Sequence, residues 1–314
     1  MNNKIWKKAL ISLSLPIIVF VIFYILQPSR FGDLRSMYMI LQQAMLPSVM
    51  AWGLFFILTL GLWDFSLGGV MVLSGIVGGI IGLIGNAISP MLGYILMFTI
   101  SITIGALLCF INGIVYIKLK IPSIVVTIGL LMIYEIFATI IPGTNGTGVS
   151  LYRNLSMFGR PPYNIIIGLL SMLLAYFLYD YTVIGIQVRA IGSNEIVAKS
   201  MGVQTEKIKV FAFVIAGIFV GINGAMTLSY TSMMIPQTSL ASLGRIFSPV
   251  MGCMIGIIFQ KYINPIIGIL IGEFTITMLI TGLMAINIDA TIQKVVIGIF
   301  LIIVSGVVTR KRTV

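Results

Sequence analysis

The sequence contains no histidine, only two cysteines and only eight acidic residues among 314. Without histidine the chain lacks the commonest general base and the usual imidazole ligand of metal ions. Cys109 and Cys253 both lie inside apolar runs without metal-ligand spacing, so we interpret them as small packing residues. These absences exclude a histidine-based triad and a histidine metal centre, and we expect neither enzyme activity nor a metal site.

Two short motifs of nucleotide and metal chemistry are also missing. The sequence contains no G-x-x-x-x-G-K-[ST] stretch, whose backbone N–H groups cradle phosphates, and no H-E-x-x-H stretch. The chain therefore cannot bind ATP through a P-loop, and we expect no cofactor on it.

Charge is scarce and apolar residues dominate. Charged residues make up 9% of the chain, against about 25% in a typical soluble domain. Hydrophobic residues make up 59%, and the mean hydropathy is +1.14. The apolar runs are continuous rather than alternating, which favours membrane-spanning helices over a β-barrel. The sequence therefore predicts an all-α polytopic membrane protein.

We expect about ten transmembrane helices in a single transmembrane domain over residues 1–314. The predicted spans are 9–26, 38–60, 66–84, 91–117, 121–141, 163–179, 208–230, 244–258, 262–284 and 290–308. No small-residue cleavage site follows the first span, so we interpret it as a retained helix rather than a signal peptide.

The basic residues indicate the orientation. With the N-terminus in the cytoplasm, thirteen lysines and arginines fall in inside segments: Lys4, Lys7, Lys8, Lys118, Lys120, Arg189, Lys199, Lys207, Lys209, Lys261, Arg310, Lys311 and Arg312. Four fall outside: Arg30, Arg35, Arg153 and Arg160. Cytoplasmic loops carry such an excess, so we expect both termini inside. The net charge of +11 then reflects topology and anionic lipid, not nucleic acid.

Glycines recur four residues apart in several spans. The pairs are Gly75 and Gly79, Gly78 and Gly82, Gly217 and Gly221, Gly252 and Gly256, and Gly268 and Gly272. Small residues at this spacing let helix backbones approach closely in lipid, so we expect tight helix–helix contacts at these positions.

One long polar connection stands out at residues 180–209. Within it Ser193 has the character of a helix N-cap, Glu195 falls in the first turn, and Gly202 falls where a helix end favours a left-handed residue. We expect a short helix at the cytoplasmic surface. It is either an ordinary amphipathic connector or a docking helix for a cytoplasmic partner.

Three stretches resemble ribose-type (monosaccharide) ABC transporter permeases. They are VRAIGSNEIVAKSMGVQTEKIKVFAFVIAGIFVGINGA, FINGIVYIKLKIPSIVVTIGLLMIY at 110–134 and LGLWDFSLGGVMVLSG at 60–75. The resemblance implies an importer subunit in the bacterial cell membrane that works by alternating access with a separate ABC ATPase, which binds the ATP. It also implies an extracytoplasmic solute-binding protein and a second permease copy or a related permease.

The resemblance assigns residues to two roles. Contact with the ATPase is expected of Arg189, Ala190, Gly192, Asn194, Glu195, Ala198 and Gly202. The translocation path is expected to include Asp64, Ser66, Asn112, Thr127 and Asn223. Asp64 and Ser66 would lie at a break between two membrane helices, where their oxygens would accept from free N–H groups in the first turn of the next span.

The sequence departs from the family pattern at several positions. Trp63 is an additional residue before Asp64, only Gly252 and Gly256 remain of a glycine-rich stretch, and Glu135 and Glu273 lie inside spans. We therefore expect a divergent member, and the expected solute is a small polar molecule such as the monosaccharides ribose, xylose or galactose. The alternative is an ion- or proton-coupled secondary transporter that uses Glu135 and Glu273.

Overall fold

The computed structural model describes residues 2–31, 33–141, 146–289, 292–293, 295–300 and 302–303. In chain order the helices and strands are α1 (Asn2–Leu26), α2 (Pro28–Phe31), α3 (Leu34–Thr59), α4 (Leu67–Ile88), α5 (Pro90–Leu119), α6 (Ser123–Ile140), β1 (Val149–Ser150), the 3-10 helix η1 (Met157–Gly159), α7 (Tyr163–Asp180), α8 (Val183–Ser193), α9 (Glu195–Ser200), α10 (Thr205–Thr231), β2 (Met233–Met234), the 3-10 helix η2 (Ala241–Ile246), α11 (Phe247–Phe259) and α12 (Pro265–Ala285). The only regular strands within the described ranges, β1 and β2, pair antiparallel.

Hydropathy predicted the membrane helices well. Eight segments of the described chain are helical, long and apolar enough to cross a bilayer, which confirms the all-α polytopic fold. Nine of the ten expected spans coincide with helices, α1 being the first and η2 with α11 the eighth. Of the tenth, 290–308, the structure describes only 292–293, 295–300 and 302–303; Lys294 and Arg310–Arg312 lie outside the described residues.

The chain divides into two compact units. One consists of residues 1–51 with 248–314, and the other of residues 52–247. The first unit is therefore discontinuous in sequence, and the second is inserted between its two parts. A single domain over 1–314 stays a prediction.

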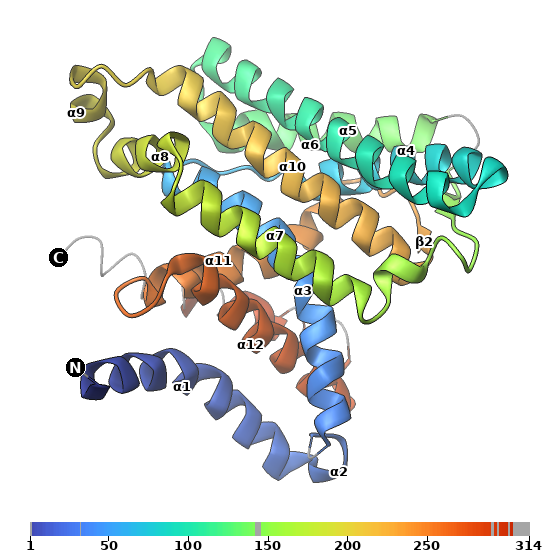
Figure 1. Cartoon of the computed structure of the whole chain (residues 1–314), viewed down its shortest axis with the longest axis vertical. Coiled ribbons are helices and arrows are strands. Elements are labelled where there is room, and N and C mark those ends of the chain that lie inside the picture. The colour runs from blue at the N-terminus through green and yellow to red at the C-terminus, as the bar shows by residue number, and fades with distance from the viewer. Residues whose placement is uncertain are drawn as a thin grey trace. The chain divides into compact units, whose positions relative to one another are not determined.

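Within residues 52–247, α5 packs against both α4 and α10 (Figure 1). Glycines allow these contacts. A Cβ atom on Gly78 would lie 2.0 Å from Ser101 Oγ, and one on Gly217 would lie 2.3 Å from the carbonyl oxygen of Gly105. Both distances are far shorter than van der Waals contact, so a larger residue would force the helices apart. The expected close approach at these glycines is confirmed.

Within residues 1–51 and 248–314, α1 packs against α12, and Gly282 lies against the ring of Phe23. The α11 and α12 helices meet through their glycines, since a Cβ on Gly272 would lie 2.9 Å from the carbonyl oxygen of Gly252. Cys253 is buried, and its thiol donates to the carbonyl oxygen of Ala51 at 3.0 Å. Cys109, in the other unit, is also a free buried thiol, consistent with two packing cysteines.

Candidate functional site

The segment between α3 and α4 is a break in the helical structure. Residues 60–66 are not helical, and they run along the first turns of α6. The backbone N–H of Trp63 donates to Ser123 Oγ at 3.0 Å, and that of Phe65 donates to Thr127 Oγ1 at 3.1 Å. Two hydroxyl side chains of α6 thus replace the backbone partners that a continuous helix would have supplied.

Asp64 organises a buried polar network at this break, and its side chain is only 1% exposed. Its Oδ1 accepts from the backbone N–H and the hydroxyl of Ser66, at 2.8 and 2.6 Å. The side-chain amide of Asn112 donates to Asp64 Oδ2 at 3.0 Å and to Ser66 Oγ at 2.6 Å. The Tyr134 hydroxyl donates to Asn112 Oδ1 at 2.7 Å. The network therefore joins the start of α4 to α5 and α6.

The capping expected of this pair is only partly correct. Asp64 does accept an N–H group at the start of α4, from the N-cap residue Ser66. Ser66 makes no side-chain capping bond, because its hydroxyl donates to Asp64 instead of accepting from the first turn. The expectation that Ser66 caps α4 is wrong. The sequence also gave no signal for Tyr134, which completes the network from α6.

A second break precedes α11. The chain leaves β2, passes residues 235–240 without regular structure, and then forms η2 before α11 begins. Glu135 of α6 is 3% exposed and accepts three hydrogen bonds from this segment. Its Oε2 accepts from the N–H of Leu240 at 2.9 Å, and its Oε1 accepts from the N–H of Ser242 at 2.8 Å and from the Ser242 hydroxyl. A carboxylate thus satisfies the first free N–H groups of η2.

The two breaks touch each other. A Cβ on Gly68, in the first turn of α4, would lie 2.1 Å from the carbonyl oxygen of Ser242 in η2. Tyr134 and Glu135 are consecutive on α6, so one helix anchors both breaks. Non-helical backbone at membrane depth is tolerated where it is buried in protein or lines a cavity, and transporters build solute sites from such discontinuous helices. We call the contact between residues 60–68 and 239–246 the break junction; it is the candidate functional site.

Four of the five expected path residues lie at this junction. Asp64, Ser66, Asn112 and Thr127 are all buried there and hydrogen-bond to other protein groups. Asn223 lies apart from them on α10, where its Oδ1 accepts from Thr227 Oγ1 at 3.1 Å. These residues connect helices in the described state. Their contact with a solute stays a prediction.

Glu273 lies in the other unit, on α12, and is fully buried. Its Oε2 accepts from the Ser248 hydroxyl at 2.8 Å, whereas its Oε1 has no donor among the described residues. A Cβ on Gly252 would lie 2.4 Å from Oε1, so the carboxyl group packs against the glycine backbone of α11.

The 180–209 connection contains two short helices rather than one. Thr182 caps α8, and Asn194 caps α9, since its Oδ1 accepts from the N–H of Val197 at 3.1 Å. The predicted N-cap Ser193 is wrong by one residue, because Ser193 is the last residue of α8. Gly202 has φ +87°, which confirms the expected left-handed residue beyond α9.

The α8 helix is fixed to membrane helices α7 and α3. The Arg189 guanidinium donates to the carbonyl oxygen of Tyr179 at 2.5 Å, pairs with Asp180 at 3.2 Å and lies 4.9 Å from the centre of the Tyr179 ring. That ring in turn contacts Phe55 of α3, with ring centres 5.0 Å apart. A Cβ on Gly192 would lie 2.0 Å from the carbonyl oxygen of Thr59, the last residue of α3. The end of α8 thus rests directly on the end of α3.

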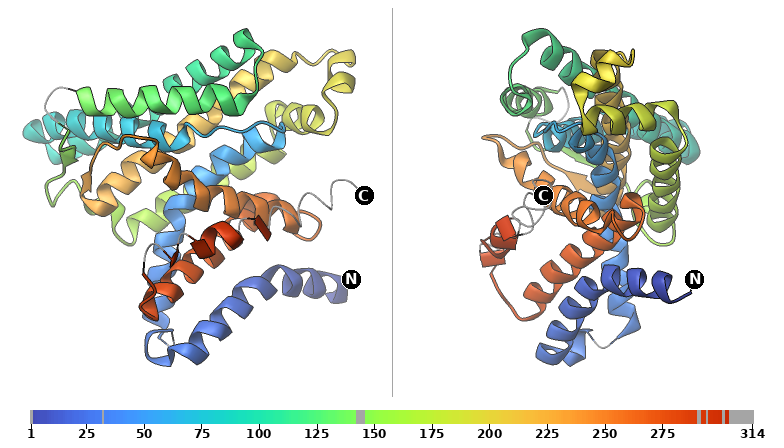
Figure 2. Two further views of the ribbon diagram at one scale, coloured as in Figure 1. Left: turned by 180° about the vertical axis from the view of Figure 1, so that it is seen from behind. Right: turned by 90° about the vertical axis from the view of Figure 1, so that its left-hand side faces the viewer.

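The α9 helix contacts α10 on one side and is exposed on the other. Glu195 pairs with Lys209 of α10 at 2.6 Å, and Ala198 is buried. Ile196 is 82% exposed and Met201 79% exposed, and neither was singled out in the sequence. Figures 1 and 2 show α8 and α9 at the end of this unit where α7 ends and α10 begins.

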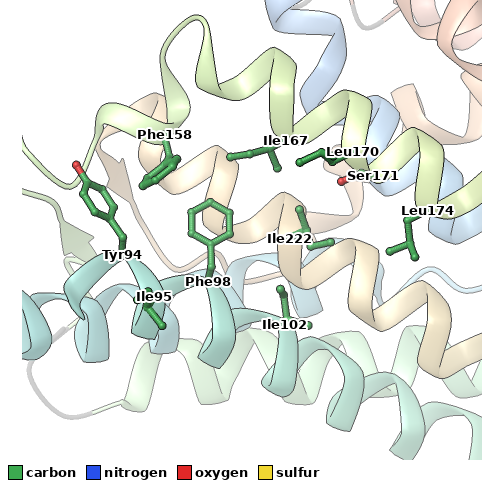
Figure 3. Close-up of a pocket in the computed structure, with 10 residues that line it drawn as sticks. All are labelled: Tyr94, Ile95, Phe98, Ile102, Phe158, Ile167, Leu170, Ser171, Leu174 and Ile222. Carbon is green, nitrogen blue, oxygen red and sulfur yellow. The ribbon is translucent and has the colours of Figure 1, made fainter. Parts of the chain in front are cut away.

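The described residues show neither a metal-type cluster nor a polar lining in the groove beside α5 and α7. They contain no group of three or more cysteine, aspartate or glutamate residues that could hold a metal ion. A groove of about 410 Å³ lies between α5, α7, α10 and η1 (Figure 3), and is lined by aliphatic and aromatic side chains such as Ile95, Phe98 and Leu170, together with Tyr94 and Ser171. Such an apolar lining suits bilayer contact rather than recognition of a polar solute.

Known proteins resemble this chain over nearly its whole length. Residues 36–305 match the family described as branched-chain amino acid transport system / permease component. The ribose import permease protein RbsC of Bacillus subtilis is 28% identical over 303 residues, which cover 94% of this chain and 91% of that protein. RbsC of Escherichia coli K12 is 24% identical, covering 99% and 96%.

A third relative has a different named solute. The autoinducer 2 import system permease protein LsrC of Yersinia pseudotuberculosis is 27% identical over 237 residues, covering 72% of this chain and 66% of that protein. No solved structure matches the chain. Because the family match covers most of the sequence and the spans agree with it, this chain belongs to the branched-chain amino acid transport system / permease component family and is a multi-pass ABC transporter permease of the bacterial inner membrane.

Proposed function

We propose that this chain is the transmembrane subunit of an ATP-driven importer for a small polar solute, and that it works by alternating access. The observation that carries the proposal is the contact between α8 and α3, where Gly192 rests on the carbonyl oxygen of Thr59. It connects an exposed cytoplasmic element to the helix that leads into the break junction. Movement of α8 would therefore act directly on residues 60–66.

The energy source in this proposal is a separate ABC ATPase. The chain has no P-loop of its own. Ile196 on α9 and Met201, the residue that follows α9, expose apolar side chains. The helix itself is anchored by Ala198 and the Glu195–Lys209 pair. Large exposed apolar side chains beside polar ones are typical of interaction surfaces. Arg189, Gly192 and Gly202 would position this surface rather than contact the ATPase.

We infer an uncharged polyhydroxy solute, with a monosaccharide such as ribose, xylose or galactose as the first choice. The two relatives named ribose import permease support this choice. The break junction supports it independently, because both oxygens of Asp64 and both of Glu135 are engaged by protein donors. A site whose acids are already engaged offers hydrogen-bonding groups rather than a free charge to a solute.

The proposed assembly has four further components. An extracytoplasmic solute-binding protein delivers the solute, and a second copy of this chain or a related permease completes the path. The ATPase binds on the cytoplasmic side, and membrane lipid surrounds the assembly. The basic inside segments suit the anionic inner leaflet.

One observation favours a second function, a proton- or ion-coupled secondary transporter. Glu273 is fully buried and its Oε1 has no donor among the described residues. Intramembrane acids of this kind serve as coupling sites in other transporters. Glu135 does not favour this alternative, because three donors from Leu240 and Ser242 engage it.

The test is gentle purification of the tagged chain from native membranes, followed by mass spectrometry of the proteins that accompany it. The proposal predicts a stoichiometric P-loop ATPase, lost from a Glu195→Lys variant but kept by a Gly129→Ala control. Gly129 is suitable as a control because a Cβ there meets nothing within 4 Å. A clean monomer or homodimer without ATPase would refute the importer and leave Glu273 as the residue to test.

A further inference from the structure

The turn that leads into η2 has an unusual backbone. Ser239 has φ +59° and Leu240 has φ +64°, two consecutive residues in the left-handed region without a glycine between them. Residues with a Cβ atom rarely adopt this region, and they stay there only when surrounding contacts determine it. What holds these two residues is therefore of functional interest.

The contacts that hold the turn come from one side chain of α6. The carboxylate of Glu135 accepts from the N–H groups of Leu240 and Ser242 and from the Ser242 hydroxyl. Within the turn itself, Ala241 N–H donates to the carbonyl oxygen of Thr238 at 3.2 Å, and Leu243 N–H donates to that of Leu240 at 3.1 Å. Glu135 thus holds the strained turn at the two N–H groups that these internal bonds leave unused.

The turn also lies at the break junction. Its Ser242 carbonyl is in contact with Gly68 at the start of α4, and β2 connects it to the expected extracytoplasmic side. The strained turn thus lies between the β1–β2 pair and the start of α4, and loss of the Glu135 bonds would release it.

We propose that Glu135 is a positioning residue that holds the turn 239–242 in its left-handed conformation, and that release of this turn opens the solute path on the extracytoplasmic side of the break junction. Only the opening of the solute path rests on the proposed function; the positioning role of Glu135 does not. Neither the family match nor the names of the relatives assigns a role to this residue.

The first experiment measures amide-resolved hydrogen exchange in the purified chain in lipid nanodiscs, with wild type, Glu135→Gln and Glu206→Gln. Glu206 is an exposed acid on α10 and serves as the matched control. In E135Q we expect exchange about 10- to 100-fold faster at Leu240 and Ser242, as loss of charge-assisted bonds predicts. Because the turn is released as a unit, Ala241 and Leu243 should exchange faster too, although their own acceptors remain.

The left-handed strain at Leu240 gives a second measurement, which separates a positioning role of Glu135 from a merely structural one. Glycine adopts the left-handed region without penalty, so Leu240→Gly should make the turn less dependent on Glu135. In this background E135Q should accelerate exchange only a few-fold. The same factor in both backgrounds, or acceleration confined to the Leu240 and Ser242 amides, would overturn the positioning role.

The gating part is tested on the complex with its copurified ATPase. ATP with vanadate should change exchange across residues 240–243 by more than about threefold in wild type and E206Q, as gating of a two-state element requires. In E135Q the nucleotide should have no further effect, because the turn is already released. If the nucleotide does not change exchange in the wild type, the gating claim is overturned. If no ATPase copurifies, the importer function fails, and the nucleotide-free arms still decide the role of Glu135.

Discussion

The α8–α3 joint makes a quantitative prediction for Gly192→Ala. The added methyl carbon would lie 2.0 Å from Thr59 O and 3.0 Å from Thr59 C. Both are backbone atoms, so no side-chain rotation relieves the clash, and the end of α8 must move by about 1.4 Å to reach van der Waals contact at 3.4 Å. Overpacking of this kind costs about 1–3 kcal/mol.

A penalty of this size shifts the equilibrium between docked and undocked α8 by about 5- to 150-fold. We expect normal membrane insertion, because the substitution adds one methyl group outside the spans, together with loss of most of the coupling to the ATPase. The assay is ATP hydrolysis by the permease–ATPase complex in nanodiscs, with the amount of bound ATPase measured in parallel. Gly129→Ala adds the same methyl group where nothing lies within 4 Å. If G192A binds ATPase and hydrolyses ATP as well as G129A, the joint does not transmit motion.

Three further substitutions test other contacts. Asp64→Ala should lower the melting temperature, because it leaves donors of Ser66 and Asn112 buried without their Asp64 acceptor, at a cost of about 1–3 kcal/mol each. Asp64→Asn should lower it less, and equal melting temperatures of wild type, D64A and D64N would contradict the network. Glu195→Lys should release ATPase from the purified complex, since it replaces the 2.6 Å pair with Lys209 by a like-charge contact, and charge reversal at exposed Glu206 is the control. Gly202→Val should weaken the same association through backbone strain alone, because φ is +87° and an added Cβ atom would meet nothing within 4 Å. Gly202→Asn should weaken it less, and retention of the ATPase by G202V would refute this prediction.

The sequence predicted features that depend on composition and local chemistry. The spans follow from apolar runs long enough to cross a bilayer, so nine of them coincide with described helices. Asp64, an acid between two such runs, correctly indicated the first break. The left-handed Gly202 followed from the general preference for glycine beyond a helix end.

Other features depend on contacts that no local pattern encodes. Glu135 accepts from Leu240 and Ser242, more than a hundred positions away, and the Tyr134 hydroxyl donates to Asn112 on a neighbouring helix. Hydropathy also treats η2 and α11 as one apolar run, which conceals the second break. The error at Ser193 had another cause. Serine and asparagine are equally good N-caps, so local preference does not choose between Ser193 and Asn194. Because α8 continues to Ser193, the extended backbone that an N-cap requires falls at Asn194.

The positions of the buried acids are physically related to the breaks. A charged acid at the centre of a membrane helix costs about 2.5–3.5 kcal/mol on insertion scales. Asp64 and Glu135 instead accept N–H groups at the starts of α4 and η2, where the unpaired donors and the helix dipole favour negative charge. Each break therefore stabilises its acid, and each acid satisfies the donors that its break exposes. Glu135 extends from α6, and the backbone N–H groups of Trp63 and Phe65 beside Asp64 donate to hydroxyls of α6. A shift of this single helix would therefore disturb both breaks together. In the mechanism that we propose, a movement that begins at α8 would reach residues 60–66 through Thr59 and pass across the break junction to the turn at 239–242.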